Sequence, residues 1–313
     1  DVQTGERQWH YQFIHHEIWG GDVPNAPIIA DLPNGRKIVM SVTKQAWIYA
    51  FDRLTGEPIW PIVERPVPQG DVPGEWYSPT QPFPTRPAAF DRQGFTEDDL
   101  IDYTPELRAM ALEAVQDFRL SRTIFTPPSL QDHPDGTRGL LSLPSSTGGA
   151  NWEHSAFDPE TGIVYVPSRT QLQVLALAKN PDSDIDLSQG FGVRAPRVQG
   201  LEIVKPPYGR VTAIDMNSGE HLWWIANADT PERIKNHPLL EGIDVPRTGI
   251  PTRSGVLLTK TLLFVGEGTG GAGASPIFRA VDKTTGEILF ELDLPDNQTG
   301  LPFTYEHDGK QYL

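Results

Sequence analysis

The stretch Asp52-Arg53-Leu54-Thr55-Gly56-Glu57, followed by Trp60, carries a string that returns along the chain: Asp, two variable residues, Thr or Ser, Gly, usually Glu, then an aromatic residue. The other copies begin at Asp1, Asp158, Asp215 and Asp282, and their aromatic residues are Trp9, Tyr165, Trp223 and Phe290. Such a recurring unit is typical of a propeller or solenoid, because one unit cannot bury its apolar face alone. The sequence therefore predicts a repeat protein.

Each copy has the composition of a β-hairpin. The segment before the turn is apolar and alternating, as in 47–51 and 210–214. The Asp side chain can hydrogen-bond the turn backbone, the Gly supplies a positive φ, and a β-rich stretch follows. We therefore expect every copy to be a strand-turn-strand unit of a four-stranded blade. A β-sandwich with recurring Thr-Gly turns is the alternative, but a sandwich gives no reason for an aromatic residue at a fixed offset.

The interval between Asp52 and Asp158 is the longest between successive copies, so we expect an insertion there, over 61–130. Its first part, 61–95, is rich in Pro, which favours an extended surface loop over a helix or a ladder strand. Thr104 then precedes Pro105, and apolar residues recur at helical spacing, which predicts a helix over about 105–119. Whether the insertion packs over a blade edge or roofs the central channel stays open.

Composition limits the possible classes of protein. Blades share their cores, so residues 1–313 are expected to form a single domain of roughly four blades. The formal net charge of −15 opposes binding to a phosphate backbone, and we expect no nucleic-acid partner. Cysteine is absent, and His15 and His16 would point to opposite faces of a strand. We therefore assign no metal ligand in this span.

The repeat resembles the tryptophan-docking motif of quinoprotein dehydrogenases, eight-bladed β-propellers in which the Trp packs one blade onto the next. The strings at 15–24, 43–45, 79–83 and 125–129 are similar, in order, to the glucose-dehydrogenase-like branch of that family. The resemblance implies an all-β fold: a partial eight-bladed β-propeller with tryptophan-docking repeats and one short helical insertion, covering roughly the C-terminal half of the propeller.

The same resemblance implies a function. It implies PQQ-dependent oxidation of an alcohol or sugar, with pyrroloquinoline quinone (PQQ) and calcium as cofactors, the calcium ligands lying upstream of this span. It also implies an electron acceptor such as a quinone or a cytochrome, and a periplasmic location with any membrane anchor outside this span. A non-catalytic β-propeller scaffold for protein-protein interaction is the alternative, because related propellers serve that role.

Three residues take cofactor-binding roles by this resemblance. Lys44 would stabilise the charge that develops on the quinone oxygens, although a strand Lys is more often an exposed edge guard. Asn151 would offer its amide to the polar edge of the cofactor, or would close a Gly-rich turn instead. Trp152 would contact the cofactor or dock a blade.

One departure concerns the general base, which in the family directly follows the strand Trp. Here Trp19 is followed by Gly20 and Gly21, which cannot accept a proton. Asp22 would share a face with position 20 of a strand, so we predict Asp22 as a substitute catalytic base, with Glu17 as another carboxylate on that face. The same departure predicts lost or altered activity.

Overall fold

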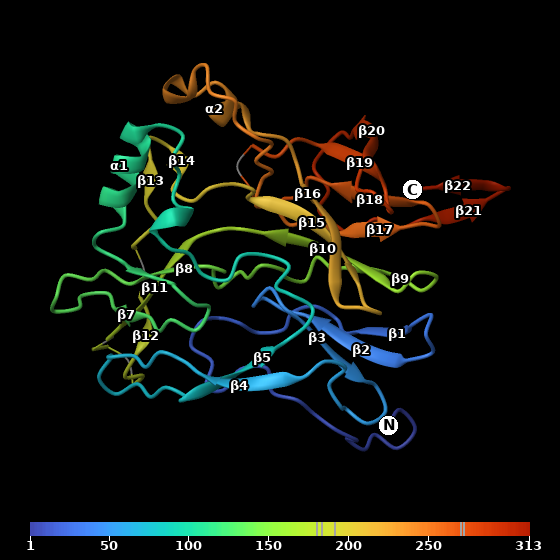
Figure 1. The fold of residues 1–313 in the computed structure, drawn as a ribbon, viewed down its shortest axis with the longest axis horizontal. Coiled ribbons are helices and arrows are strands. Elements are labelled where there is room, and N and C mark those ends of the chain that lie inside the picture. Colours follow the sequence, from blue (N-terminus) through green and yellow to red (C-terminus); the bar gives the residue numbers. More distant parts are fainter. Residues whose placement is uncertain (180, 183, 191, 270, 272) are drawn as a thin grey trace.

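The computed structural model describes residues 1–179, 181–182, 184–190, 192–269, 271 and 273–313 (Figure 1). Within these ranges the chain is mostly β-structure. It has two short helices, α1 (Pro105–Ala114) and α2 (Glu232–Lys235), and single 3-10 turns at Glu97–Asp99 and Pro238–Leu240. The all-β expectation therefore holds in the coarser form of a mostly β-chain, and α2 is an addition that the sequence did not predict.

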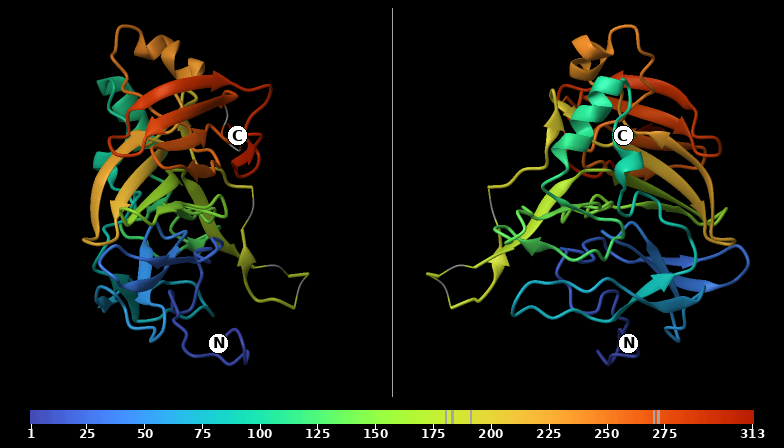
Figure 2. Two further views of the ribbon diagram at one scale, coloured as in Figure 1. Left: turned by 90° about the vertical axis from the view of Figure 1, so that its right-hand side faces the viewer. Right: turned by 60° about the vertical axis from the view of Figure 1, so that its left-hand side comes forward.

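Three antiparallel sheets form the main body. Sheet I contains β1 (Ile28–Asp31), β2 (Lys37–Val42) and β3 (Ile48–Asp52); sheet II contains β9 (Ala156–Asp158), β10 (Ile163–Arg169), β15 (Gly209–Asp215) and β16 (Glu220–Ala226); sheet III contains β17 (Val256–Leu258), β18 (Leu262–Gly266), β19 (Ile277–Asp282) and β20 (Ile288–Asp293). Figures 1 and 2 show the sheets stacked in chain order. Each interface has its own apolar core: Met40, Val164 and Ile214 belong to the cluster of sheets I and II, and Val211 and Leu263 belong to the cluster of sheets II and III.

An indole packs on a repeat Gly turn in each of the three sheets. A Cβ added to the glycine would lie 2.6 Å from the ring for Trp9 on Gly56, 3.1 Å for Trp60 on Gly219, and 2.9 Å for Trp223 on Gly286. The three glycines have φ between +77° and +79°, a conformation that suits Gly and that leaves room for the ring. The predicted tryptophan docking is therefore present.

The copy at Asp158 differs from the others. Its turn joins β9 to β10 in sheet II, whereas the Asp215 turn joins β15 to β16 in the same sheet. Its Gly162 faces Asn217 rather than an indole, and Tyr165 lies buried on β10. The Asp158 copy is still a strand-turn-strand unit of a four-stranded sheet, as its string predicts, because such a sheet offers more than one hairpin for the same turn chemistry.

The remaining strands lie mainly beside the stack. They are β4 (Ile62–Pro66) and β5 (Thr80–Pro84), which pair with each other; β6 (Arg119–Leu120), β7 (Ser129–Leu130), β8 (Leu140–Ser142), β11 (Gln173–Ala178) and β12 (Ser188–Gln189), which share a sheet; β13 (Arg197–Val198) with β14 (Leu201–Glu202); and β21 (Tyr305–His307) with β22 (Lys310–Tyr312). The expectation that 61–95 holds no ladder strand is wrong. A two-stranded ladder has a free edge on each strand, which tolerates Pro.

Helix α1 begins where the sequence predicts. The Leu107 amide donates to Thr104 Oγ1 at 3.1 Å, Pro105 occupies the first turn, and Leu107 and Ala111 are buried. The helix ends at Ala114 and not near 119, because Arg119 enters a parallel ladder with β8 and its amide donates to Gly139 O at 3.0 Å. We call α1, α2 and the short strands around their shared apolar core the side unit.

Candidate functional site

Two of the predicted site residues lie in direct contact. Lys44 Nζ donates to Asp22 Oδ1 at 2.5 Å, across 22 positions of sequence. Lys44 lies in the turn between β2 and β3, not in a strand, and its side chain is 13 % exposed, so the interpretation of an exposed edge guard is wrong. The Asp22 side chain is 63 % exposed and its Oδ2 makes no contact with the described part of the chain.

The segment before Asp22 is a turn and not an extended strand. Both Glu17 carboxylate oxygens accept backbone hydrogen bonds, from Trp19 N at 2.7 Å and from Gly20 N at 2.9 Å. The Trp19 indole donates to Thr126 O at 2.7 Å, which ties this turn to the insertion. The prediction that Asp22 shares a strand face with position 20 is therefore wrong, because residues 17–22 form no strand and a turn brings Asp22 to Lys44 instead. Glu17 is occupied in holding that turn.

Position 20 has little room for a side chain. Gly20 has a φ of +78°, and an added Cβ would lie 2.8 Å from Ser146 Cβ. A non-glycine residue would therefore require a strained backbone and a shift of the facing segment. The structure explains glycine at position 20 by close packing.

The Gly-rich run 147–149 packs directly on Lys44. An added Cβ at Gly148 would lie 2.4 Å from Lys44 Cγ, and Gly149 N donates to Lys44 O at 2.9 Å. Arg169 holds the run from the other side, with Nη2 donating to Thr147 O at 2.9 Å. Burial lowers the pKa of the Arg169 guanidinium, while the Glu153 carboxylate acts in the opposite direction.

Asp91 is a functional candidate that the sequence did not reveal. Its buried carboxylate accepts hydrogen bonds from Ser168 Oγ at 2.5 Å, Thr170 Oγ1 at 2.6 Å and Arg92 N at 2.7 Å. Ser168 and Thr170 flank Arg169, so these bonds orient the end of β10 that holds the Lys44 turn in place. Asp91 lies 77 positions before Ser168, and no local pattern signals such a contact.

Asn151 and Trp152 have different environments. Asn151 is buried, its Nδ2 donates to Thr147 O at 2.8 Å, and its Oδ1 accepts from Trp152 N at 2.9 Å. The Asn151 amide therefore closes the Gly-rich turn. Trp152 is 57 % exposed and its ring lies 4.3 Å from the guanidinium carbon of Arg253. The interpretation of Trp152 as a blade-docking residue is wrong, because its face is open to solvent and to Arg253.

A cavity of about 20 Å³ adjoins Lys44 and is lined by Ile14, Trp19, Gly21, Gln45 and Phe125, among others. Gln45 Oε1 is buried without a hydrogen-bond partner in the described part of the chain. A cavity of this size and polarity suits one water molecule and is far too small for a tricyclic quinone.

Metal ligands do not cluster in the described ranges: no group of three or more His, Cys, Asp or Glu side chains is placed to hold an ion. His15 and His16 contact separate carboxylates, Glu64 at 2.9 Å and Glu75 at 2.8 Å. Over the same ranges, no helix has the length and apolar character needed to cross a membrane.

Comparison with known proteins places this geometry in context. Residues 1–313 match the family model described as "PQQ: Glucose/ethanol/alcohol dehydrogenase, beta-propeller domain". The chain is 29 % identical to the quinate/shikimate dehydrogenase (quinone) of Acinetobacter baylyi, covering 100 % of this chain and 40 % of that protein. It is also 29 % identical to the quinoprotein glucose dehydrogenase of Escherichia coli, again covering 100 % of this chain and 40 % of the relative.

The fold similarity extends to solved structures. The quinohemoprotein alcohol dehydrogenase of Comamonas testosteroni superposes with a TM-score of 0.55 at 19 % identity, covering 99 % of this chain and 37 % of that one. Among the relatives found by sequence, the glycerol dehydrogenase large subunit of Gluconobacter thailandicus is 29 % identical to this chain, and the chain covers 45 % of its length. The chain thus spans less than half the length of these relatives.

Proposed function

Because the chain belongs to the β-propeller family of PQQ-dependent glucose, ethanol and alcohol dehydrogenases, as its docking motif predicted, we propose that the whole protein oxidises an alcohol or a sugar with PQQ. The contact of Asp22 with Lys44 carries the proposal, because it joins the predicted base to the predicted cofactor-binding cation. We extend the proposal to an eight-bladed domain containing 1–313, a periplasmic location, and a quinone or cytochrome as electron acceptor. The quinone in the name of the Acinetobacter relative supports the first acceptor.

The donor chemistry of the site fits this cofactor. When bound, PQQ supplies an ortho-quinone that accepts hydride and accumulates negative charge. Lys44 provides the cation that stabilises such charge, and its burial strengthens the interaction. The exposed ring of Trp152 offers an apolar face, and Asn151 supports it by accepting the Trp152 amide hydrogen bond. We propose these three residues as the cofactor-binding set, with the calcium ligands elsewhere in the whole protein.

Asp22 is the proposed proton acceptor. Its Oδ1 is held by Lys44, while its Oδ2, which has no partner among the described residues, can take the proton of a substrate hydroxyl. The Lys44 ammonium fixes the carboxylate in one orientation. The family resemblance places the carboxylate of the general base at position 20, where this chain has Gly20. We therefore propose a slower rate of alcohol or sugar oxidation than that of relatives that carry this carboxylate.

Variants of the whole protein test both roles, with PQQ and calcium present and a dye as electron acceptor. Lys44→Ala removes a charge-assisted contact of about 1.5–3 kcal/mol, so PQQ affinity or turnover should fall about tenfold to a hundredfold. Asp22→Asn should abolish the rate and leave PQQ binding measurable. Lys37→Ala and Asp132→Asn change exposed residues of the same charge and serve as matched controls. Wild-type behaviour of both site variants would refute these assignments.

The non-catalytic scaffold is the second candidate function, and the glycine at position 20 favours it. The same experiment separates the two. A whole protein that binds no PQQ and oxidises no alcohol or sugar, while remaining folded, would support the scaffold over the enzyme.

A further inference from the structure

A cavity of about 540 Å³ lies between the side unit and the ends of sheets II and III. Its lining includes Thr170, Leu172, Arg194, Arg197, Glu202 and Arg233, and we call it the arginine pocket. The contributing segments are distant in sequence: the turn after β10, the chain before β13, strand β14 and helix α2. The volume falls within the range of small-molecule sites, roughly 300–1,000 Å³.

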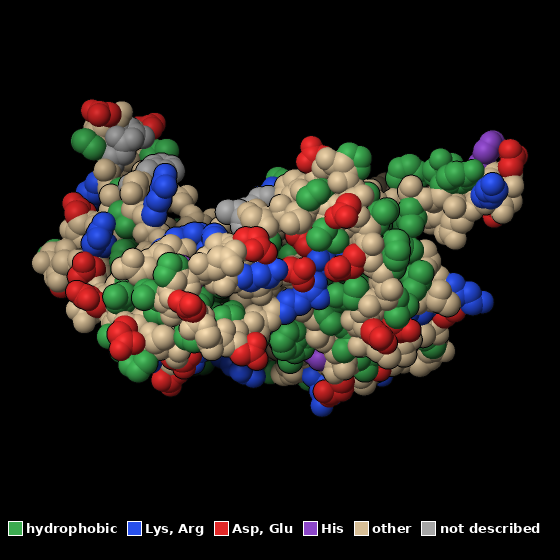
Figure 3. Space-filling model, turned by 90° about the horizontal axis from the view of Figure 1, so that it is seen from above, with side chains coloured by type: hydrophobic (Ala, Val, Ile, Leu, Met, Phe, Trp, Pro, Cys, Tyr) green, Lys and Arg blue, Asp and Glu red, His purple; other side chains and the backbone are tan. Residues whose placement is uncertain are grey.

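The charge of the pocket is the opposite of the charge of the chain. Its charged lining residues are three arginines and one glutamate, in a chain whose formal charge is −15. Figure 3 shows several Lys and Arg side chains on the side of the molecule that carries α1 and α2, with Asp and Glu side chains among them. Like charges brought together repel one another, so the arrangement favours an anion between them.

The single carboxylate does not neutralise the three guanidiniums. Glu202 Oε1 lies 2.6 Å from Arg197 Nη2 and 3.5 Å from Arg233 Nη2, so one oxygen serves both. Arg194 has no ion pair and no side-chain hydrogen bond in the described part of the chain. Arginine binds carboxylate and phosphate through two parallel N–H donors of its guanidinium group. In Arg194 these donors have no partner among the described residues.

The rest of the lining distinguishes an organic anion from a bare ion. Leu172, Ala195 and Pro251 supply apolar walls, and the volume is many times that of a phosphate ion. The Thr170 hydroxyl donates to Asp91 at 2.6 Å and is not free to donate to a ligand. Apolar walls with a few charged groups favour a carbon skeleton that carries charge at its ends.

We propose that the arginine pocket binds a small organic dicarboxylate. One carboxylate pairs with Arg194, the second lies near Arg197 and Arg233, and the carbon chain contacts Leu172 and Pro251. The inference does not depend on the redox function, because none of the residues assigned to that function lines the pocket.

Calorimetric titration of the full-length protein with glutarate tests the proposal at physiological ionic strength, where screening beyond about 8 Å suppresses non-specific attraction. We expect saturable binding with one glutarate per chain. Arg194→Gln should weaken it at least tenfold without affecting the fold, since Arg194 loses no ion pair or side-chain hydrogen bond to any described residue. Arg36→Gln removes the same charge from an exposed position in the β1–β2 turn and should leave the affinity unchanged.

Inorganic phosphate provides the second arm of the test. Much weaker binding of phosphate than of glutarate would support a ligand with a carbon skeleton. Equal affinity for the two would overturn the dicarboxylate assignment, because the pocket would then recognise charge alone. Absence of saturable glutarate binding, or equal effects of Arg194→Gln and Arg36→Gln, would overturn the site itself.

Discussion

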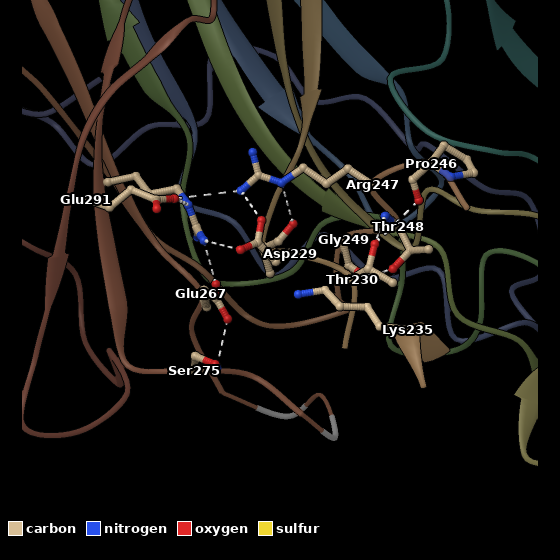
Figure 4. Close-up of polar contacts among 12 residues, drawn as sticks. Asp229, Thr230, Lys235, Pro246, Arg247, Thr248, Gly249, Glu267, Ser275 and Glu291 are labelled. Carbon is tan, nitrogen blue, oxygen red and sulfur yellow. Dashed lines mark hydrogen bonds and ion pairs between the residues drawn. The ribbon is translucent and has the colours of Figure 1, made fainter. Parts of the chain in front are cut away.

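The buried ion pair of sheet III should be essential to its stability. Arg279 and Glu267 have side chains that are each 2 % exposed, and Arg279 Nη2 lies 2.7 Å from Glu267 Oε1. Figure 4 labels Glu267 together with its other partner, Ser275. Glu267 Oε2 accepts the Ser275 amide hydrogen at 2.7 Å, while Arg279 Nε donates to the half-exposed Glu291 at 2.6 Å. Glu267 therefore depends on Arg279 for its only close cation among the described residues.

Arg279→Met leaves the Glu267 charge buried without that cation. Removing one partner of a buried pair costs about 3–5 kcal/mol, whereas replacing both partners by apolar residues of similar volume is close to neutral. We therefore expect the single variant to lose that amount of stability and the double variant Arg279→Met with Glu267→Leu to recover most of it. Arg247→Met is the control: its side chain is 34 % exposed, so a loss of about 1 kcal/mol or less is expected.

Urea unfolding of the full-length protein, followed by tryptophan fluorescence, gives the four free energies through the midpoint and slope of each transition. The slopes must agree for the comparison to hold. Equal losses for Arg279→Met and Arg247→Met would refute the reasoning. So would a double variant no more stable than Arg279→Met.

Three other predictions concern the docking residue Trp223, the ion pair of Asp158 with Lys283, and the exposed aromatic residue Phe290. Trp223→Ala should cost about 3–5 kcal/mol, whereas the neighbouring Trp224→Ala, at a side chain that is 53 % exposed, should cost about 1 kcal/mol or less in the same unfolding assay. Burial opposes ionisation of Asp158, but hydrogen bonds from Lys283 Nζ at 2.6 Å and from nearby groups outweigh burial and lower its pKa. The stabilisation from the Asp158 carboxylate is therefore fully present above the unfolded pKa of about 4 and is lost as pH falls through the lower folded pKa. Asp158→Asn should be less stable than wild type at pH 7, and this difference should shrink as pH falls below about 4. Phe290 occupies the docking offset but is 61 % exposed, so residues 1–313 alone should self-associate and Phe290→Ser should reduce this in sedimentation velocity; a monodisperse wild-type chain would contradict the expectation.

The local features of this fold could be predicted from the sequence because their causes are local. In the repeat turn, the Asp52 carboxylate accepts from Leu54 N and Thr55 N, and Gly56 N closes the turn on Asp52 O. All of these contacts lie within a few residues, so the string itself specifies the hairpin. The start of α1 is local for the same reason, since Thr104 caps the Leu107 amide.

Only the tertiary structure decided which copies dock and where the site groups meet. The strings at Asp158 and Asp215 carry the same turn chemistry, yet only the Asp215 turn receives an indole, because pairing of β10 with β15 places both in one sheet. The end of α1 and the ladder in the Pro-rich segment were likewise set by strands remote in sequence. The Asp22–Lys44 contact, the Asp91 cluster and the arginine pocket each bring together segments that are far apart in the sequence. No repeat or periodic pattern in the sequence indicates that these segments meet. Their geometry depends on the stacking of the sheets, where burial and long-range pairing outweigh local preference.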